Sequence, residues 1–130
     1  MYINNDSSFE FLKLGLDASA IRGKVISNNM ANINTANFKK SFVSFEDNLK
    51  EETRKFNLKK TKEAHLSGVG NDSIISVEKD KSTSMRADGN NVDLDLEKVN
   101  QASNTLMYNA LITQANSKLA MTKNVISGGN

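Results

Sequence analysis

The chain has 130 residues, 38% hydrophobic and 25% charged, and its 17 basic and 15 acidic residues give a net charge of +2. This length allows one domain with a modest core. Because basic and acidic residues are almost equal in number, the net charge argues neither for nor against a nucleic-acid partner. The absence of cysteine excludes disulfides and thiolate zinc sites. The sequence contains no run of about 18 apolar residues, so no membrane span is predicted.

The first residues, MYINNDSSFEF, lack the basic start and apolar middle of a secretory signal peptide. We therefore expect a protein that stays in the cell or leaves it by a route that needs no cleaved signal.

The periodicity predicts a long amphipathic helix from about Ser8 to Ile33, preceded by a capping-box pattern over Ser7–Glu10. Its heptad seam consists of Phe9, Leu12, Leu16, Ile26, Met30 and Ile33. Ser19 and Gly23 occupy the two intermediate seam positions, where small residues allow another helix to approach closely. A flanking apolar stripe contains Leu14, Ala18, Ile21 and Val25.

The middle of the chain is predicted to be extended. Residues 73–78 (SIISVE) are typical of a strand, and residues 82–86 are predicted to pair with it through a turn at residues 79–81. Residues 50–63 are crowded with charge, but glutamates interrupt the basic cluster. A solvated segment is therefore favoured there over a nucleic-acid site.

A second helix is predicted to begin near Asp93 or Asp95, where these aspartates and Glu97 favour the positive end of the helix dipole. Its apolar residues, which show one phase shift, are Leu96, Val99, Leu106, Ile112, Ala115, Leu119 and Ile126. Gly128 and Gly129 predict its end.

Two stretches, Val25 to Phe38 and Val99 to Ser117, contain no charged residue. Their polar residues are asparagine, glutamine, serine and threonine. Since interface cores are depleted of charge, this pattern favours helices with protein neighbours on several sides. The alternative is a compositional bias, because asparagine is frequent throughout the chain.

No catalytic or metal-binding constellation emerges. His65 is the only histidine, and no ligand spacing surrounds it. The loop that starts at Asp88 resembles a calcium loop but lacks the required glycine and glutamate, since Asp93 and Val99 stand at those positions. We therefore expect no enzyme, no cofactor and no metal.

The segment NNMANINTANFKK at residues 28–40 resembles the signature of flagellar rod, hook and axial proteins, which typically reads NNIANxNTPGYK. The residues that match are Asn29, Ala31, Asn32, Asn34 and Thr35. Ala36 and Asn37 replace the usual Pro-Gly and Phe38 replaces tyrosine, which predicts a looser turn. DGNNVDLDLE at residues 88–97, the YNA that follows at residues 108–110 and the short middle are similar to the proximal rod members of this family.

This resemblance implies a structural subunit that polymerises through its terminal helices into the hollow drive shaft near the MS ring, as flagellum assembly and motility require. The expected partners are copies of itself, other rod subunits, MS-ring and rod-adaptor proteins, and the flagellar type III export apparatus. The resemblance places the chain in the periplasmic rod, with no direct membrane insertion, no nucleic acid and no catalysis.

We therefore predict a mainly α fold in which long N- and C-terminal helices pair as a coiled-coil-like hairpin. Residues 1–35 and 92–130 would form the terminal-helix domain, and residues 36–91 a small extended or β-hairpin middle. The predicted assembly residues are Phe9, Leu12, Leu16, Ile26, Met30, Ile33, Val99, Leu106, Ile112, Leu119 and Ile126. Asn29, Asn32, Asn34 and Thr35 are predicted to fix the turn after the first helix. The alternative function is a soluble helical adaptor or export chaperone that binds a partner helix in its seam.

Overall fold

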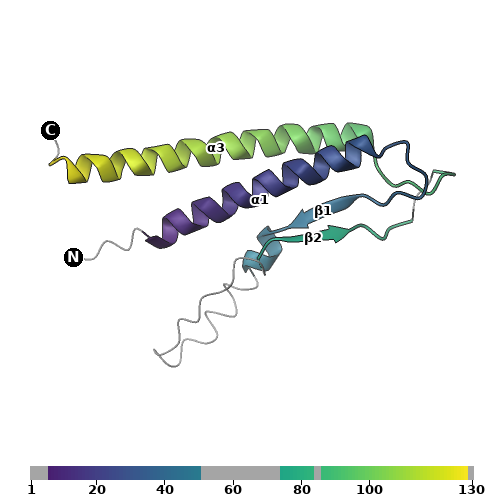
Figure 1. Ribbon diagram of the computed structural model, residues 1–130, viewed down its shortest axis with the longest axis horizontal. Coiled ribbons are helices and arrows are strands. Elements are labelled where there is room, and N and C mark those ends of the chain that lie inside the picture. Colours follow the sequence, from purple (N-terminus) through teal and green to yellow (C-terminus); the bar gives the residue numbers. More distant parts are fainter. Residues whose placement is uncertain (1–5, 51–73, 84–85, 129–130) are drawn as a thin grey trace, which may run out of the picture.

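A computed structural model describes residues 6–50, 74–83 and 86–128, with the side chains of residues 6 and 7 excepted. Its elements are helix α1 (Asp6–Ala31), strand β1 (Ser41–Ser44), strand β2 (Ser76–Lys79) and helix α3 (Leu94–Ile126), arranged as Figure 1 shows. The fold is mainly helical, with one small antiparallel sheet in the middle of the chain. This confirms the predicted fold class.

The two long helices lie side by side and antiparallel, so the start of α1 and the end of α3 lie at the same end of the pair (Figure 1). With 26 and 33 residues, α1 and α3 are about 39 Å and 50 Å long. Neither α1 nor α3, nor any shorter helix among the described residues, contains an apolar stretch of membrane-spanning length.

The ends of α3 follow the predicted signals. Asp93 caps its start, because the Asp93 carboxylate accepts hydrogen bonds from the amides of Asp95 at 3.0 Å and Leu96 at 3.2 Å. After Ile126 the chain leaves the helix through Gly128, whose φ of +79° favours glycine. Helix α1 begins at Asp6, close to the predicted start, but the predicted Ser7 cap lies outside the described side chains.

The sheet differs from the prediction. Strand β2 pairs antiparallel with β1, in a register that sets Ser41 opposite Lys79, so the expectation that residues 82–86 form its partner is wrong. The amide of Asp80 extends the ladder by donating to Lys40 O at 2.9 Å. The Asp80 carboxylate then accepts from the amide of Ser82 at 2.8 Å, and at this turn the chain leaves the ladder.

Helix α1 lies between α3 and the sheet (Figure 1). The buried cluster on its sheet side consists of Leu14, Ala18, Val43, Phe45 and Ile74. Half-buried Ile21 and Val25 pack against this cluster. The flanking stripe of the sequence is therefore the face of α1 that carries the core, and the seam beside it turns toward α3.

Candidate assembly surface

The contact between α1 and α3 is polar and close at its centre. The Ser19 hydroxyl donates to Asn104 Oδ1 at 2.9 Å, and Asn104 Nδ2 donates to the carbonyl of Ser19 at 3.0 Å. A Cβ added to Gly15 would lie 3.3 Å from Leu111 Cδ1, and one added to Gly23 would lie 3.5 Å from Asn104 Nδ2. Small residues on this face of α1, which are Ser19 and Gly23 of the predicted seam and Gly15 outside it, thus let α3 approach closely.

Because small and polar residues make this contact, most large apolar side chains of α3 remain exposed. Within this 33-residue helix only Glu97 is buried. The exposed fractions are 64% for Val99, 72% for Leu106, 53% for Leu119 and 81% for Ile126, while Ile112 is 36% exposed. All five were predicted to be assembly residues, and all five present apolar surface to the outside of the described fold.

These exposed residues form two rows, which explains the phase shift in the sequence. Val99 and Leu106 are seven residues apart, as are Ile112, Leu119 and Ile126. The six residues from Leu106 to Ile112 turn the helix by about 600°, so the second row lies about 120° around the helix from the first. Counted from Asn104, which contacts α1, Val99 and Leu106 lie about 140–160° around the helix, whereas Ile112, Leu119 and Ile126 lie about 40–80° from it. The first row is therefore on the side of α3 that faces away from α1, and the second row flanks the contact.

The predicted seam of α1 is divided between interior and surface. Ile26 is buried at 5% exposure, and Leu12, Leu16, Met30 and Ile33 are half-buried. Phe9 is 40% exposed and its neighbour Phe11, which the sequence analysis did not single out, is 55% exposed. The N-terminal end of α1 thus adds apolar surface beside the C-terminal part of α3 (Figure 1).

The chain leaves α1 through a turn held by asparagine and threonine. Asn32 Nδ2 donates to Asn28 O at 2.8 Å, and the Thr35 hydroxyl donates to Asn32 Oδ1 at 3.2 Å. Asn29, only 1% exposed, reaches the start of β1, where it donates to Ser41 O at 2.8 Å and accepts from the Ser41 amide at 2.9 Å. Asn34 is exposed.

Asn37 stands where the signature has glycine and adopts the conformation that glycine favours. Its φ is +58°, which asparagine tolerates better than most residues. Its amide donates to Asp88 O at 2.7 Å. At Gly89, with φ +73°, an added Cβ would lie 2.7 Å from Asn37 Oδ1. The turn, in which Ala36 and Asn37 replace Pro-Gly, thus docks closely on residues 88–89.

Asn90 is a structural residue that the sequence analysis missed. It has no exposed surface, and its Nδ2 donates to the carbonyls of Asn32, Ile33 and Thr35 at 2.9–3.0 Å. Its Oδ1 accepts from the amide of Val92 at 2.8 Å. Asn90 thereby ties the end of α1 to the segment that leads into α3. The sequence signal was a second asparagine-rich stretch, but nothing local pairs it with the first.

The next residue, Asn91, fastens the same segment to the sheet. Its Oδ1 accepts from the amide of Lys40 at 2.7 Å, and its Nδ2 donates to Asp80 O at 3.2 Å. Together Asn90 and Asn91 connect α1, the strand ends and the start of α3, so the orientation of α3 is set by hydrogen bonds near its N-terminus.

Arg22 connects α1 to the segment after β1. Its Nη2 donates to both carboxylate oxygens of Glu46, at 2.7 and 2.8 Å, and its Nη1 donates to Met107 Sδ on α3 at 3.8 Å. Partial burial raises the pKa of Glu46, but the hydrogen bonds from Arg22 and from the backbone, with the Arg22 charge, outweigh it and leave that pKa below its ordinary value. The carboxylate is therefore held in its charged form.

The family described as "Flagella basal body rod protein" matches residues 11–39, which comprise most of α1 and the turn after it.

Relatives extend the similarity over nearly the whole chain. The flagellar basal body rod protein FlgB of Bacillus subtilis is 38% identical over 118 residues, which cover 91% of this chain and 92% of that protein. The proteins of the same name from Borreliella burgdorferi and Salmonella typhimurium are 37% and 30% identical. These two alignments cover 82% and 96% of this chain, and 85% and 96% of the respective relatives.

Proposed function

The chain belongs to the FlgB family of flagellar basal body rod proteins, and on this premise we propose that α3 carries the surface by which it joins its neighbours. It is a structural subunit of the flagellar basal-body rod and associates with other rod components. The observation that supports the proposed surface is the exposure of α3, which buries only Glu97 although it is rich in large apolar side chains.

The energetics favour assembly through this helix. Full burial of a valine, leucine or isoleucine side chain contributes about 1.5–3 kcal/mol of stabilising free energy. The two apolar rows of the single chain are exposed, so their burial against neighbours would stabilise an assembly. Most helix stability in proteins comes from packing of an apolar face. Neighbours on both rows would supply that packing, and the absence of charge between Val99 and Ser117 suits an interface core.

Two apolar rows also suit polymerisation. A contact between different surfaces of successive copies does not close on itself and generates a helical filament. We infer that the rows at Val99–Leu106 and Ile112–Ile126 meet different neighbours, with Phe9, Leu12, Leu16, Met30 and Ile33 completing the surface on α1. Ile26 contributes from the interior by holding α1 in place.

We also propose the setting and the partners. The subunit would be exported through the flagellar type III apparatus without a cleaved signal and would join the hollow, periplasmic drive shaft near the MS ring. Its neighbours there would be copies of itself, other rod subunits, and MS-ring and rod-adaptor proteins. Its part would be mechanical, with no catalytic role. The alternative of a soluble adaptor or export chaperone finds no support, because the relatives reported above are named as rod proteins.

The direct test is mass spectrometry of detergent-extracted, density-purified basal bodies from the source cell. We expect this chain to be enriched together with ring and hook proteins, and to be lost from basal bodies when its gene is deleted. A chain that is absent from basal bodies but abundant in the soluble fraction would contradict the proposed role and favour the adaptor.

A further inference from the structure

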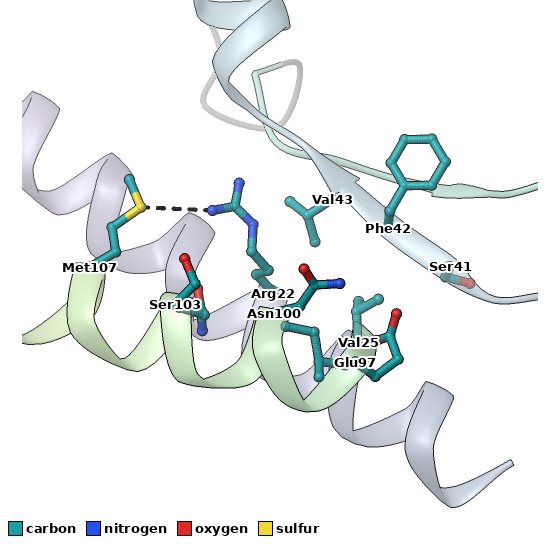
Figure 2. A pocket seen from close by; sticks show the side chains of 11 residues that line it. Arg22, Val25, Ser41, Phe42, Val43, Glu97, Asn100, Ser103 and Met107 are labelled. Carbon is teal, nitrogen blue, oxygen red and sulfur yellow. Dashed lines mark hydrogen bonds between the residues drawn. The ribbon is translucent and has the colours of Figure 1, made fainter. Parts of the chain in front are cut away.

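A groove of about 310 Å³ lies where α1, β1 and α3 meet (Figure 2). Val25 and Val43 form apolar parts of its wall, and Asn100 and Ser103 contribute exposed polar side chains from α3. Glu97, the one buried residue of α3, also lines it. The groove thus combines apolar walls, polar groups and a carboxylate.

Glu97 is 3% exposed, yet its carboxylate is weakly compensated. Its Oε2 accepts one hydrogen bond, from Asn29 Nδ2 at 3.1 Å, and the same nitrogen also donates to Ser41 O. Among the described residues, no second side chain donates to the Glu97 carboxylate and no cation lies within ion-pair distance of it. Burial of a carboxylate is costly unless a cation or several donors accompany it.

Arg22 lines the same groove but is committed elsewhere. Both of its terminal nitrogens are engaged, one by the Glu46 carboxylate and the other by Met107 Sδ. Figure 2 shows the Arg22 guanidinium directed toward Met107, away from Glu97. The Arg22 guanidinium in the groove is therefore already paired with Glu46. The Glu97 carboxylate lies away from it and accepts its hydrogen bond from the neutral amide of Asn29.

We propose that this groove receives a lysine side chain from an adjoining copy of this chain, and that Glu97 pairs with its ammonium group. The inference rests on the proposed function, since a rod subunit has copies beside it. A lysine fits because its methylene stem can lie along the apolar wall while its charged tip reaches the carboxylate.

The chain itself offers suitable lysines. It has 14 lysines and three arginines, and the two described arginines, Arg22 and Arg86, already form ion pairs with Glu46 and Asp88. Exposed lysines project from both helices, at Lys13 and Lys24 on α1 and at Lys98 and Lys123 on α3. Charge complementarity thus favours a lysine of a second copy as the occupant.

Cross-link mass spectrometry of purified basal bodies tests the pairing. The basal bodies are treated with a carbodiimide, which couples a carboxylate to an amine in contact with it. We expect an amide bond between Glu97 and a lysine of a second copy, distinguished from an intrachain bond by mixing isotope-labelled and unlabelled chains. Glu97→Gln should abolish this bond, and Asp95→Asn, which changes an exposed carboxylate in the same helical turn, should preserve it. A Glu97 bond only to a lysine of another rod protein, or no bond at all, would overturn the inference.

Incorporation of the same variants separates assembly from folding. We expect Glu97→Gln to keep the thermal unfolding midpoint of the wild type and to lower the amount in basal bodies at least about tenfold, because it removes one partner of a buried charge pair. Asp95→Asn should incorporate normally. Wild-type incorporation of Glu97→Gln, or a fall in its unfolding midpoint that accounts for the loss, would contradict the inference while leaving the rod function intact. Absence of the wild-type chain from basal bodies would instead contradict the rod function.

Discussion

Ser19 of α1 and Asn104 of α3 exchange two hydrogen bonds, from the Ser19 hydroxyl to Asn104 Oδ1 at 2.9 Å and from Asn104 Nδ2 to the Ser19 carbonyl at 3.0 Å. Ser19 is only 2% exposed, so this polar pair is shielded at the centre of the helix contact. A polar pair at one seam position specifies register, because sliding either helix would leave its groups without partners. The contact fixes α3 while its larger apolar side chains point outward.

Replacing Asn104 with alanine should therefore loosen the helix pair. Both hydrogen bonds would be lost and the Ser19 hydroxyl would stay buried, so we expect the free energy of unfolding to fall by about 1–3 kcal/mol. Urea denaturation measures it. Asn116→Ala, at an exposed position of the same helix, is the control and should change this free energy by less than about 0.5 kcal/mol. Equal effects of the two variants would rule out a special role for the pair.

The side-chain hydrogen bonds of Asn90 form a clasp between the end of α1 and the segment that leads into α3. This clasp offers a sharper test, because aspartate has the same shape as asparagine but lacks the NH₂ donor. In Asn90→Asp a carboxylate would face the carbonyls of Asn32, Ile33 and Thr35, and we expect a loss of at least about 2 kcal/mol in the free energy of unfolding. Asn34→Asp, at an exposed position of the same turn, is the matched control. Hydrogen exchange should also accelerate at the end of α1 in the Asn90 variant alone. Unchanged protection there would show that the clasp does not hold the turn.

The left-handed conformation of Asn37 predicts a ranking of substitutions. Asn37→Gly should be tolerated, since glycine adopts positive φ without steric cost. Asn37→Val should lower the unfolding free energy by about 1–2 kcal/mol, because a β-branched side chain clashes in that region. Thermal unfolding of the two variants checks the ranking, and a valine variant as stable as the glycine variant would contradict the assigned conformation.

The ion pair between Arg22 and Glu46 predicts a modest pH dependence. The folded state lowers the pKa of Glu46 below its ordinary 4.5, so the contribution is fully present above that value and is lost as the pH falls through the folded pKa. Because the Glu46 side chain is 48% exposed, solvent screening limits the effect to less than about 1 kcal/mol. Urea unfolding of the wild type and of Glu46→Gln, from about pH 6 to about pH 3, measures it. We expect their difference in stability to shrink on acidification, and a constant difference would exclude this pair as the cause.

The helices were predictable because their signals are local. Apolar spacing located α1 and α3, Asp93 marked the start of α3 and Gly128 its end. The small seam residues Ser19 and Gly23 also predicted a close helix contact, and the structure places Asn104 against both.

The sheet and the asparagine clasp were not predictable for the opposite reason. Strand β2 has its partner far back in the chain, at residues 41–44, whereas the prediction chose the nearest extended stretch. Asn90 contacts carbonyls more than fifty residues earlier, and nothing around Asn90 indicates them. The phase shift in α3 was visible in the sequence, but its meaning as two outward rows emerged only when the α1 contact was located.

The central claim is that the exposed rows of α3 build the rod, and incorporation of charged variants into basal bodies tests it most directly. Leu106→Asp and Leu119→Asp place a charge in each row, at positions 72% and 53% exposed, while Asn109→Asp adds the same charge at an exposed polar position. Leu16→Asp tests the α1 side of the surface.

We expect the three leucine variants to fail to incorporate and their cells to lose motility. The Asn109 variant should remain in basal bodies, and Leu106→Asp and Leu119→Asp should keep wild-type helicity, since their side chains are exposed in the single chain. Wild-type amounts of Leu106→Asp and Leu119→Asp in purified basal bodies would contradict assembly through α3.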